Sequence, residues 1–348
     1  MEIEQLPLVL LAVIFVISAA FVWLAGTRLA VNGDELAERL NLTREFMGLV
    51  FLATATELPE IVTTLTAAHV DNAALVLGNM FGGITMQTAI LAVADIFVVR
   101  NALTSWPRKS THALLAVILI VLLGLLLTIT FAGDFVLVLN VGLGAILLTG
   151  AYPLTLILLR RYDERNSWAP IDLPEDFDRQ KTIASKSNGL EKTATKWLVI
   201  QSLGCSAIIL IAGVALALSA DAMAEKTAIG SSFIGISLLA AATSLPELST
   251  TIAAARIGAY TMAINNIFGS NLIMIALILP ADIAYRGGAI LSEANIGAQF
   301  SIATGILVTA IYVAGLLIRR TPKILGAGFD SWLVLGVYLA SLYAVYHM

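Results

Sequence analysis

The chain has 348 residues, of which 59% are hydrophobic and only 13% are charged. Soluble domains carry about 25% charged residues, so this composition, with a mean hydropathy of +0.91, excludes a soluble globular protein and indicates a chain that lies mostly in lipid. Unbroken apolar runs also exclude a β-barrel, whose strands alternate apolar and polar residues. The net charge of −4 says little about partners, and the single Cys205 excludes a disulfide framework and a thiolate metal site.

Ten apolar runs follow one another along the chain, each about 20 residues long, which is the length that a helix needs to cross a bilayer. They lie near residues 8–31, 46–67, 73–98, 112–131, 135–159, 197–219, 229–255, 260–284, 297–318 and 329–347. The first run lacks a cleavage-like small-residue site before the second, so we expect it to be a retained span and not a signal peptide.

The positions of Lys and Arg predict the orientation of these spans, because positively charged loops stay on the cytoplasmic side. With ten spans, 18 of the 20 basic residues fall on one face, and only Lys226 and Arg286 fall on the other. We therefore expect an integral protein of the plasma or inner membrane with both termini non-cytoplasmic.

A polar stretch at residues 160–196, which mixes eight basic with seven acidic residues, predicts a cytoplasmic linker between a first unit at 1–159 and a second at 197–348. The two units are related, because a shift of 187 positions aligns residues 48–68 with 235–255 without a gap, and twelve of these 21 positions are identical. Five spans per unit give the second unit the opposite polarity. The prediction is an all-α membrane protein of ten transmembrane helices, arranged as two inverted five-helix repeats.

Three carboxylates, Glu57, Glu60 and Glu247, fall in the middle of predicted spans. A carboxylate placed there costs roughly 2.5 kcal/mol or more, and no Lys or Arg is available at the same depth. A bound cation or a proton is the partner that we expect.

A proline stands directly before two of these glutamates and breaks each helix, which frees backbone carbonyls one turn upstream. The candidate carbonyls belong to Ala53 or Thr56 in the first repeat, and to Ala240 or Thr243 in the second. Backbone with unpaired carbonyls is tolerated inside a membrane only where it lines a polar cavity. All ligand atoms of the predicted site are therefore oxygens. Oxygen ligands suit Ca²⁺, Na⁺ and Mg²⁺ and disfavour Zn²⁺ and Cu²⁺.

Other interpretations stay open for several of these residues. Glu60 and Glu247 could be neutral and structural, although this leaves their symmetric duplication unexplained. Small hydroxyl residues such as Thr56, Thr243 and Ser244 also mediate helix packing in lipid, and Asn79 and Asn266 could simply bridge helices. In the same segments, the glycines Gly82, Gly83 and Gly269 are more consistent with helix packing than with ion binding. Ser270 fits either role.

The duplicated segments resemble the α-repeats of the calcium:cation antiporter superfamily, in its sodium/calcium exchanger branch. The resemblance rests on Ala-Thr-Ser-Leu-Pro-Glu at 242–247, on Asn-Ile-Phe-Gly-Ser-Asn at 266–271 and on the gapless repeat. It implies ten helices in inverted halves, with spans one and six sliding to alternate access. By this similarity Glu60 and Glu247 are the central calcium ligands, helped by the Thr56 and Thr243 carbonyls. The residues that it places at flanking sodium positions are Ala53, Ala240, Ser244 and Ser270.

This sequence departs from the family pattern in residues near the predicted site. Glu57 and Gly83 stand where serines are usual, Gln87 stands where an asparagine is usual, and Met274 stands where an asparagine or aspartate is usual. Glu57 and Glu60 are three residues apart, so they repel each other if the turn persists, and this favours a shared proton. The candidate site residues therefore include Glu57 and Gln87, and the counter-ion is sodium or a proton.

Together these observations predict a secondary active antiporter that exchanges calcium for sodium or protons. The alternatives are a proton- or sodium-coupled exchanger of Mg²⁺, Mn²⁺ or a monovalent cation, and a cation channel on the same scaffold. We expect no enzymatic activity, because no nucleophile motif accompanies the paired carboxylates. We expect no cofactor and no nucleic-acid partner; the partners are the lipid bilayer and inorganic cations, and the working unit is a monomer.

Overall fold

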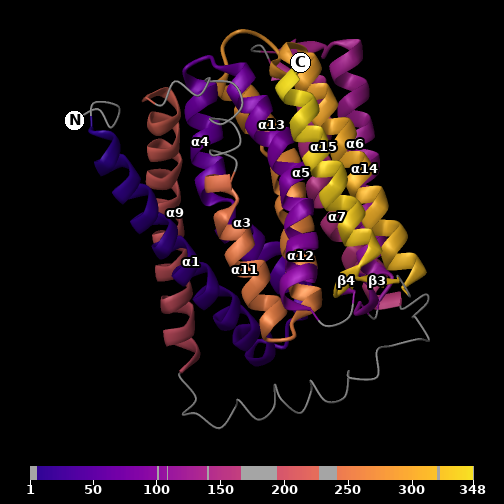
Figure 1. Cartoon of the computed structure of the whole chain (residues 1–348). Helices are drawn as coiled ribbons and strands as arrows, with labels where there is room; N and C mark the ends of the chain where they lie inside the picture. Colours follow the sequence, from indigo (N-terminus) through magenta and orange to yellow (C-terminus); the bar gives the residue numbers. More distant parts are fainter. Residues whose placement is uncertain are drawn as a thin grey trace.

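The structure is a computed structural model of the whole chain, and it describes residues 6–99, 102–107, 109–138, 141–165, 194–226, 241–319 and 322–347. Within these ranges, eight helices are long and apolar enough to cross a membrane, and a bent pair brings the number to nine. The predicted span at 229–255 lies partly outside the described residues. The protein is thus a multi-pass helical membrane protein (Figure 1).

The first half of the chain contains one bent span among straight ones. Its elements are α1 (Leu8–Arg39), α2 (Arg44–Phe46), the π-helix η2 (Met47–Leu52), α3 (Ala53–Thr56), α4 (Leu58–His69), α5 (Ala73–Val98), the 3₁₀ helix η3 (Leu103–Ser105), α6 (Thr111–Ala132), β1 (Val136–Val138), β2 (Val141–Gly142) and α7 (Leu143–Arg165).

The second half follows the same order. Its elements are α9 (Thr195–Lys226), α11 (Leu245–Arg256), α12 (Tyr260–Ala276), α13 (Ile278–Ala284), the 3₁₀ helix η6 (Ile290–Glu293), α14 (Ile296–Ile318), β3 (Lys323–Ile324), β4 (Ala327–Gly328) and α15 (Phe329–His347). Helices α7 and α9 extend by a few residues into the predicted linker, and residues 166–193 of that linker lie outside the described residues.

The repeat seen in the sequence is also present in the secondary structure. Adding 187 to the bounds of α1 and of α4 gives the bounds of α9 and of α11. The same shift places the start of η3 on the start of η6, and the start of β1 on the start of β3. Both antiparallel hairpins, β1–β2 and β3–β4, therefore belong to the repeated unit, although the apolar patterns did not predict them.

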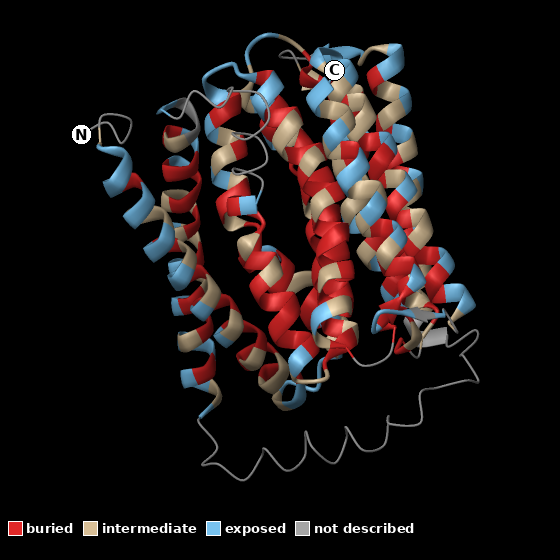
Figure 2. Cartoon of the chain, viewed as in Figure 1, coloured by how far each residue is buried: buried red, intermediate tan, exposed pale blue. Residues whose placement is uncertain are grey.

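The helices form two groups around a buried centre. Helix α1 packs along α9 and against α11, while α14 packs against α5, α6 and α15. Helices α4, α5, α11 and α12 lie between the two groups (Figure 1), and buried residues concentrate on them (Figure 2). Side chains on the outer helices, such as Val9 of α1 and Leu154 of α7, are exposed, as expected of surfaces that face lipid.

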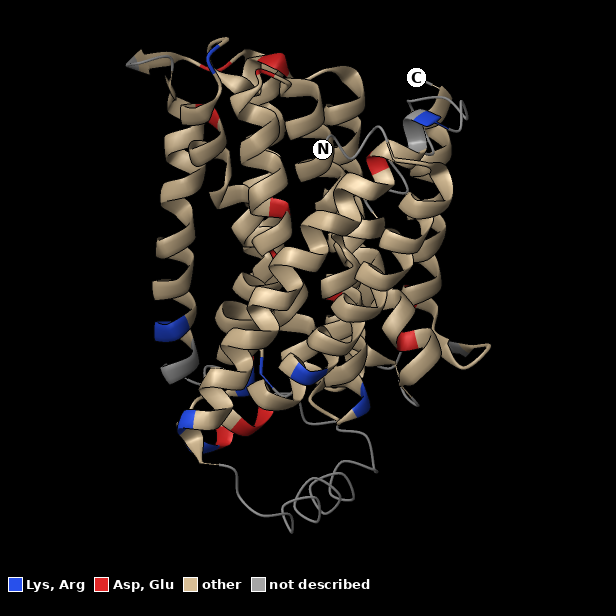
Figure 3. Ribbon diagram, turned by 90° about the vertical axis from the view of Figure 1, so that its left-hand side faces the viewer, with Lys and Arg blue, Asp and Glu red and all other residues tan. Residues whose placement is uncertain are grey.

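Charged residues are found mainly at the two ends of the bundle. Both chain termini lie at one end (Figure 1), and most of the Lys and Arg residues shown lie toward the opposite end (Figure 3). A few Asp and Glu residues lie between the ends, inside the bundle (Figure 3). This separation agrees with the charge bias of the sequence.

The second span is broken where the sequence places its proline. Thr43 caps its start by accepting a hydrogen bond from the Phe46 N–H, the chain then passes through the π-helix η2, and it bends by 48° between α3 and α4. Glu57 occupies the break, and Pro59 lies in the first turn of α4, where a missing N–H does no harm. The break therefore follows from local sequence.

Two buried aspartates tie the ends of α5 and α13 to the loops that follow them. Asp95 accepts hydrogen bonds from the Leu103 N–H at 2.7 Å, the Gly328 N–H at 3.0 Å and the Ser331 hydroxyl at 2.6 Å. Its counterpart 187 residues later, Asp282, accepts from the N–H groups of η6 and β2. Both carboxylates thus hold together backbone segments that are far apart in the chain.

We expect Asp95→Ala to lower the free energy of unfolding by about 1.5–3 kcal/mol, because it removes the acceptor of two buried N–H groups and a hydroxyl. Asp95→Asn keeps one acceptor oxygen and should lose less. Thermal unfolding of the detergent-solubilised protein checks this. Equal midpoints for wild type and Asp95→Ala would contradict the assigned role.

Candidate metal centre

Three glutamates converge at the centre of the bundle. Glu57, Glu60 and Glu247 each offer a carboxylate oxygen, and these oxygens lie within 4.8 Å of one another. All three residues are fully buried, with 0% of their surface exposed. Segments that are 187 residues apart in the chain therefore meet where the sequence places its mid-span carboxylates.

The broken helices position two of these side chains. Glu60 lies in the first turn of α4, and Glu247 lies in the first turn of α11, each directly after a proline. A helix N-terminus carries a partial positive charge from its unpaired N–H groups. The two N-termini thus supply part of the electrostatic support that a buried carboxylate needs, without a basic side chain.

The carboxylates keep most of their oxygens unpaired. Both oxygens of Glu60, both of Glu247 and the Oε2 atom of Glu57 are buried and have no hydrogen-bond partner among the described residues. Among the described residues, neither Lys nor Arg forms an ion pair with any of them. Buried charges are ordinarily paired or coordinate metals, so this arrangement fits a cation that binds between the three side chains.

The two repeats contribute to the site crosswise. The side chain of Thr56 lies beside the carboxylate of Glu247, and the side chain of Thr243 lies beside that of Glu60. Thr56 is 0% exposed and Thr243 is 1% exposed. Each threonine therefore lies beside the glutamate of the other repeat. The spacing of residues within one repeat could not predict this.

Of the two alanine carbonyls named from the sequence, that of Ala53 lies among the described residues. The Ala53 carbonyl accepts the Glu57 N–H at 3.0 Å and the Thr56 hydroxyl at 3.3 Å, so it is already engaged within its own segment. Ala53 is fully buried. Its counterpart Ala240 lies outside the described residues, so the structure does not describe the second of these positions.

Further oxygens surround Glu57. The Gln87 amide donates from Nε2 to Glu57 Oε1 at 2.6 Å, and Ser270 lies on the same carboxylate. Within the part of the chain that the structure describes, the Gln87 Oε1, Ser270 Oγ and Ser244 Oγ atoms are buried and have no hydrogen-bond partner. Gln87 and Ser270 thus lie beside Glu57, and Ser244 is a buried residue directly before α11. Their unpaired oxygens are additional candidate ligands.

The structure adds residues that the sequence analysis did not select. Asn271 is fully buried; its Nδ2 donates to the Thr88 hydroxyl at 3.3 Å, and its Oδ1 has no partner. The sequence offered one signal for selecting Asn271, which is its place as the last residue of the Asn-Ile-Phe-Gly-Ser-Asn segment. The methyl group of Met274 lies against Gly83, where an added Cβ would be 3.2 Å away. These two departures from the family pattern therefore contact each other.

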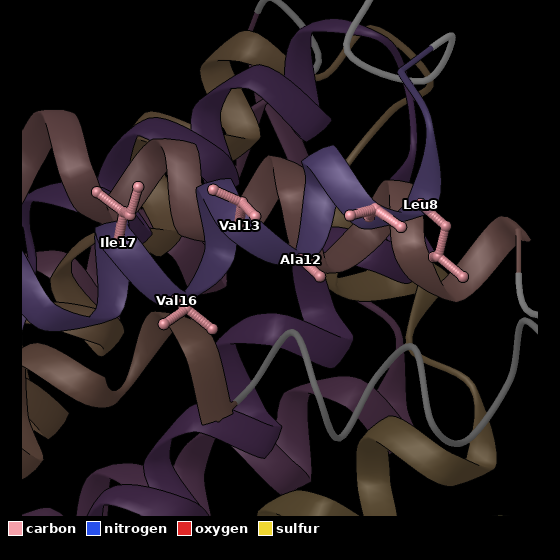
Figure 4. Close-up of a pocket in the computed structure, with 6 residues that line it drawn as sticks. Leu8, Ala12, Val13, Val16 and Ile17 are labelled. Atoms are coloured by element: carbon pink, nitrogen blue, oxygen red, sulfur yellow. The ribbon is translucent and has the colours of Figure 1, made fainter.

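A groove on the outside of α1 offers no comparable chemistry. It is lined by Leu8, Val9, Ala12, Val13, Val16 and Ile17 (Figure 4). All six side chains are apolar, so the groove lacks ligands for an ion and suits contact with lipid.

A family model described as sodium/calcium exchanger protein matches residues 10–159 and 197–348. The chain belongs to the sodium/calcium exchanger family. The two matched segments fall within the predicted units 1–159 and 197–348, and the unmatched residues between them fall in the predicted linker. The membership is therefore shown for both halves that contribute glutamates to the centre.

Two curated relatives are similar over most of this exchanger-family chain. "Putative antiporter CaxA" of Alkalimonas amylolytica is 29% identical over 283 residues, covering 81% of this chain and 83% of that protein. "Inner membrane protein YrbG" of Escherichia coli K12 is 24% identical over 347 residues, covering 96% and 99%. The match to YrbG is therefore nearly full length, and the match to CaxA covers about four fifths of each chain.

Solved structures of the sodium-calcium exchanger NCX_Mj share the fold. The protein soaked with 100 mM Na⁺ and 10 mM Sr²⁺ superposes with a TM-score of 0.72 at 16% identity, over 97% of this chain and 99% of that one. The protein soaked without Na⁺ and Ca²⁺ gives a TM-score of 0.67 at 18% identity over the same shares. The likeness covers both halves of the chain.

We expect Glu247→Gln to weaken calcium binding by about tenfold or more, because the ion loses a charged ligand. The ion-free variant should unfold no earlier than wild type, since one of three repelling carboxylates is removed. Isothermal titration and thermal unfolding measure the two effects, with the exposed Glu293→Gln as a control. Unchanged calcium binding would favour the structural role for Glu247.

Proposed function

We propose that the protein is a secondary active antiporter that exchanges Ca²⁺ for Na⁺ or protons by alternating access. The observation that carries this proposal is the convergence of Glu57, Glu60 and Glu247, buried within 4.8 Å of one another. A cation that enters the centre would pair with carboxylate oxygens that have no partner among the described residues. The family and the antiporter relative support the same class of transport.

We also propose the ten-helix arrangement with two inverted five-helix repeats, in units 1–159 and 197–348 with a linker at 160–196. Support comes from the matching bounds of α1 and α9 and of α4 and α11. Helix α1 starts at the end of the bundle where the termini lie, and α9 starts at the opposite end (Figure 1). Equivalent helices therefore run in opposite directions, as inverted repeats require.

The choice of calcium follows from the ligands. Carboxylate, hydroxyl, amide and carbonyl oxygens are ligands for hard cations, and Ca²⁺ accepts six to eight of them in irregular geometry. A single Ca²⁺ leaves one of the three negative charges unbalanced, so we propose that one proton or one Na⁺ occupies the centre as well, with the proton on Glu57 or Glu60. Ser244, Ser270 and Gln87 supply oxygens for a Na⁺ ion, together with the backbone of Ala53 and Ala240.

The charge bias supports the proposed orientation. Most Lys and Arg lie at the end of the bundle away from the termini (Figure 3), and positive residues favour the cytoplasmic side. Both termini then face away from the cytoplasm in a cell membrane. A monomer contains all three glutamates and is the proposed working unit.

Calcium uptake into proteoliposomes under an imposed Na⁺ or pH gradient tests the exchange. We expect one of the two gradients to drive uptake, and we expect proton-driven uptake to be lost in Glu57→Ser, because the site then holds one carboxylate fewer. Calcium affinity should rise with pH, since protons compete for the same oxygens. If neither gradient drives uptake in wild type or in Glu57→Ser, the proposed coupling is wrong.

A carrier differs from a channel in its response to substrate on the opposite face. We expect efflux of labelled calcium to accelerate when unlabelled calcium is added outside, because the loaded carrier returns faster than the empty one. Competition by Mg²⁺, Mn²⁺ and monovalent cations in the same assay identifies the transported ion. An efflux rate that does not change when calcium is added on the opposite side would indicate a channel.

A further inference from the structure

Buried polar side chains lead away from the glutamate centre on one side of the bundle. We call them the polar row; they come from α12, α5, α14 and α15, and they are Asn271, Thr88, Thr309, Tyr312 and Asp330. Each is at most 5% exposed. The oxygens of the row that have no hydrogen-bond partner among the described residues are Asn271 Oδ1, Thr309 Oγ1, the Tyr312 hydroxyl and Asp330 Oδ1. Such groups are costly inside a membrane protein, and they commonly mark the path of an ion or a proton.

The polar row begins beside the groups that surround Glu57. Gln87 of α5 donates to Glu57 at 2.6 Å, and Thr88 is the next residue of that helix. Thr88 accepts a hydrogen bond from Asn271 Nδ2 at 3.3 Å. Asn271 in turn directly follows Ser270, which lies on the Glu57 carboxylate. The first two members of the row are therefore one residue away from the partners of Glu57.

Helix α14, which packs against α5, continues the row. Thr309 and Tyr312 are three residues apart, so they lie on the same face of this helix. The Tyr312 ring packs edge-on against Phe268 of α12, with 5.5 Å between the ring centroids. Phe268 is three residues from Asn271 on the same helix. Tyr312 thus contacts the helix that contains the first member of the row, and Thr309 lies about one turn away.

Asp330 is the outer member of the row. A Cβ atom added to Gly315, three residues beyond Tyr312, would overlap the Asp330 carboxylate, so this side chain lies against α14. Thr104 donates to Asp330 Oδ2 at 2.7 Å, and the titratable groups beside Asp330 are Tyr312 and Asp95. None of the described Lys and Arg residues forms an ion pair with it. Asp330 is 5% exposed and lies at the start of α15, at the end of the bundle away from the termini (Figure 1).

The equivalent positions of the other repeat are apolar. By the shift of 187 positions, the counterparts of Asn271, Thr88, Thr309 and Tyr312 are Ile84, Ile275, Leu122 and Leu125. The first three of these counterparts are buried in the hydrophobic core. The centre differs in the same sense, because Met274 stands at the position equivalent to Gln87. The polar row is therefore a feature of one side, and the shared fold of the two repeats does not require it.

We propose that the polar row is a proton route between the glutamate centre and the end of the bundle away from the termini. The inference rests on the proposed antiport, with a proton as the co-ion. A proton that leaves the centre when Ca²⁺ binds passes from oxygen to oxygen, because each hydroxyl accepts one proton and gives up its own on the far side. Water molecules bridge the steps that are too long for a direct hydrogen bond. The Asp330 carboxylate takes up the proton and releases it to the solvent.

The composition of the row favours protons over calcium. Between Asn271 and Tyr312 its members are an amide, two threonine hydroxyls and a phenol, none of which is a carboxylate. Ca²⁺ binds in proteins with the help of carboxylate ligands, and a site without them holds it weakly. A proton needs only oxygens that accept and donate hydrogen bonds, so the row suits a proton and leaves calcium to another path.

Thr309→Val and Tyr312→Phe test the route, because each removes one oxygen of the row and nearly keeps the shape of the side chain. We expect both variants to bind calcium as tightly as wild type and to release the same number of protons on binding. The release should be about tenfold slower or more, since a positioned proton-transfer group contributes about 10²–10⁴-fold in rate. Titration calorimetry gives the affinity, and stopped-flow mixing of the detergent-solubilised protein with Ca²⁺ and a pH indicator gives the rate and the amplitude.

Two variants outside the row serve as controls. Thr304→Val lies on the same helix as Thr309→Val; Thr304 is also buried, and its hydroxyl already donates to the Phe300 carbonyl at 2.9 Å. Tyr338→Phe removes the phenol oxygen of a partly buried tyrosine on α15. Both controls should release protons at the wild-type rate. The ion-free Thr309→Val and Tyr312→Phe proteins should unfold no earlier than wild type, because each has lost a buried oxygen without a partner.

Three results would overturn the inference. If Thr309→Val and Tyr312→Phe release protons as fast as wild type, protons leave the centre by another path. If the slower release comes with weaker calcium binding and earlier unfolding, the two side chains are structural. If wild type binds calcium without releasing a proton, the row does not serve exchange, although an antiport with Na⁺ would stand. Failure of the antiport itself is distinguishable, since neither gradient would then drive calcium uptake by the wild-type protein.

Discussion

The structure depends on one electrostatic constraint: three carboxylates lie together in the interior of a membrane protein, and no described Lys or Arg pairs with them. Glu57, Glu60 and Glu247 repel one another and have lost their hydration. Such an arrangement is stable only if something positive binds between them or if protons neutralise them. The proposed transport is the functional use of this constraint, because the ion that satisfies the site is also the cargo.

The fold meets the constraint with broken helices and duplication. The breaks before Glu60 and Glu247 direct two helix N-termini toward the carboxylates, and the crosswise placement of Thr56 and Thr243 links the repeats at the same point. Duplication also gives the site two similar but unequal surroundings. A binding centre between two such halves can face either side of the membrane with small changes in packing.

Much of this could be predicted from the sequence. The hydropathy, the shift of 187 positions and the three mid-span glutamates were sufficient to predict a helical membrane protein with an oxygen-lined centre, because each of these signals is local or periodic. Glu57, Gln87 and Ser270 were separate candidate site residues in the sequence, and the structure had to show the 2.6 Å contact between Glu57 and Gln87. The number of ten spans stays a prediction, since part of one span lies outside the described residues.

Other features could not be predicted, because they depend on contacts between segments that are far apart in the chain. Asp95 lies near the end of an apolar run, and only the fold brings the N–H groups of Leu103 and Gly328 to it. The π-helix η2 and the two hairpins have no periodic signal of their own. Gly26 lies against Ser249, whereas Gly213 lies against Pro59. An alignment of the two repeats shows these glycines as equivalent and cannot reveal the difference.

The central claim is that a cation binds directly between the three glutamates, and anomalous diffraction from crystals soaked in Sr²⁺ or Mn²⁺ tests it most directly. The account predicts a strong anomalous peak about 2.0–2.7 Å from oxygens of Glu60 and Glu247, the usual range for hard cations and carboxylates. A map without a peak at this place, in crystals where the glutamates instead hydrogen-bond to permanent protein donors, would contradict it.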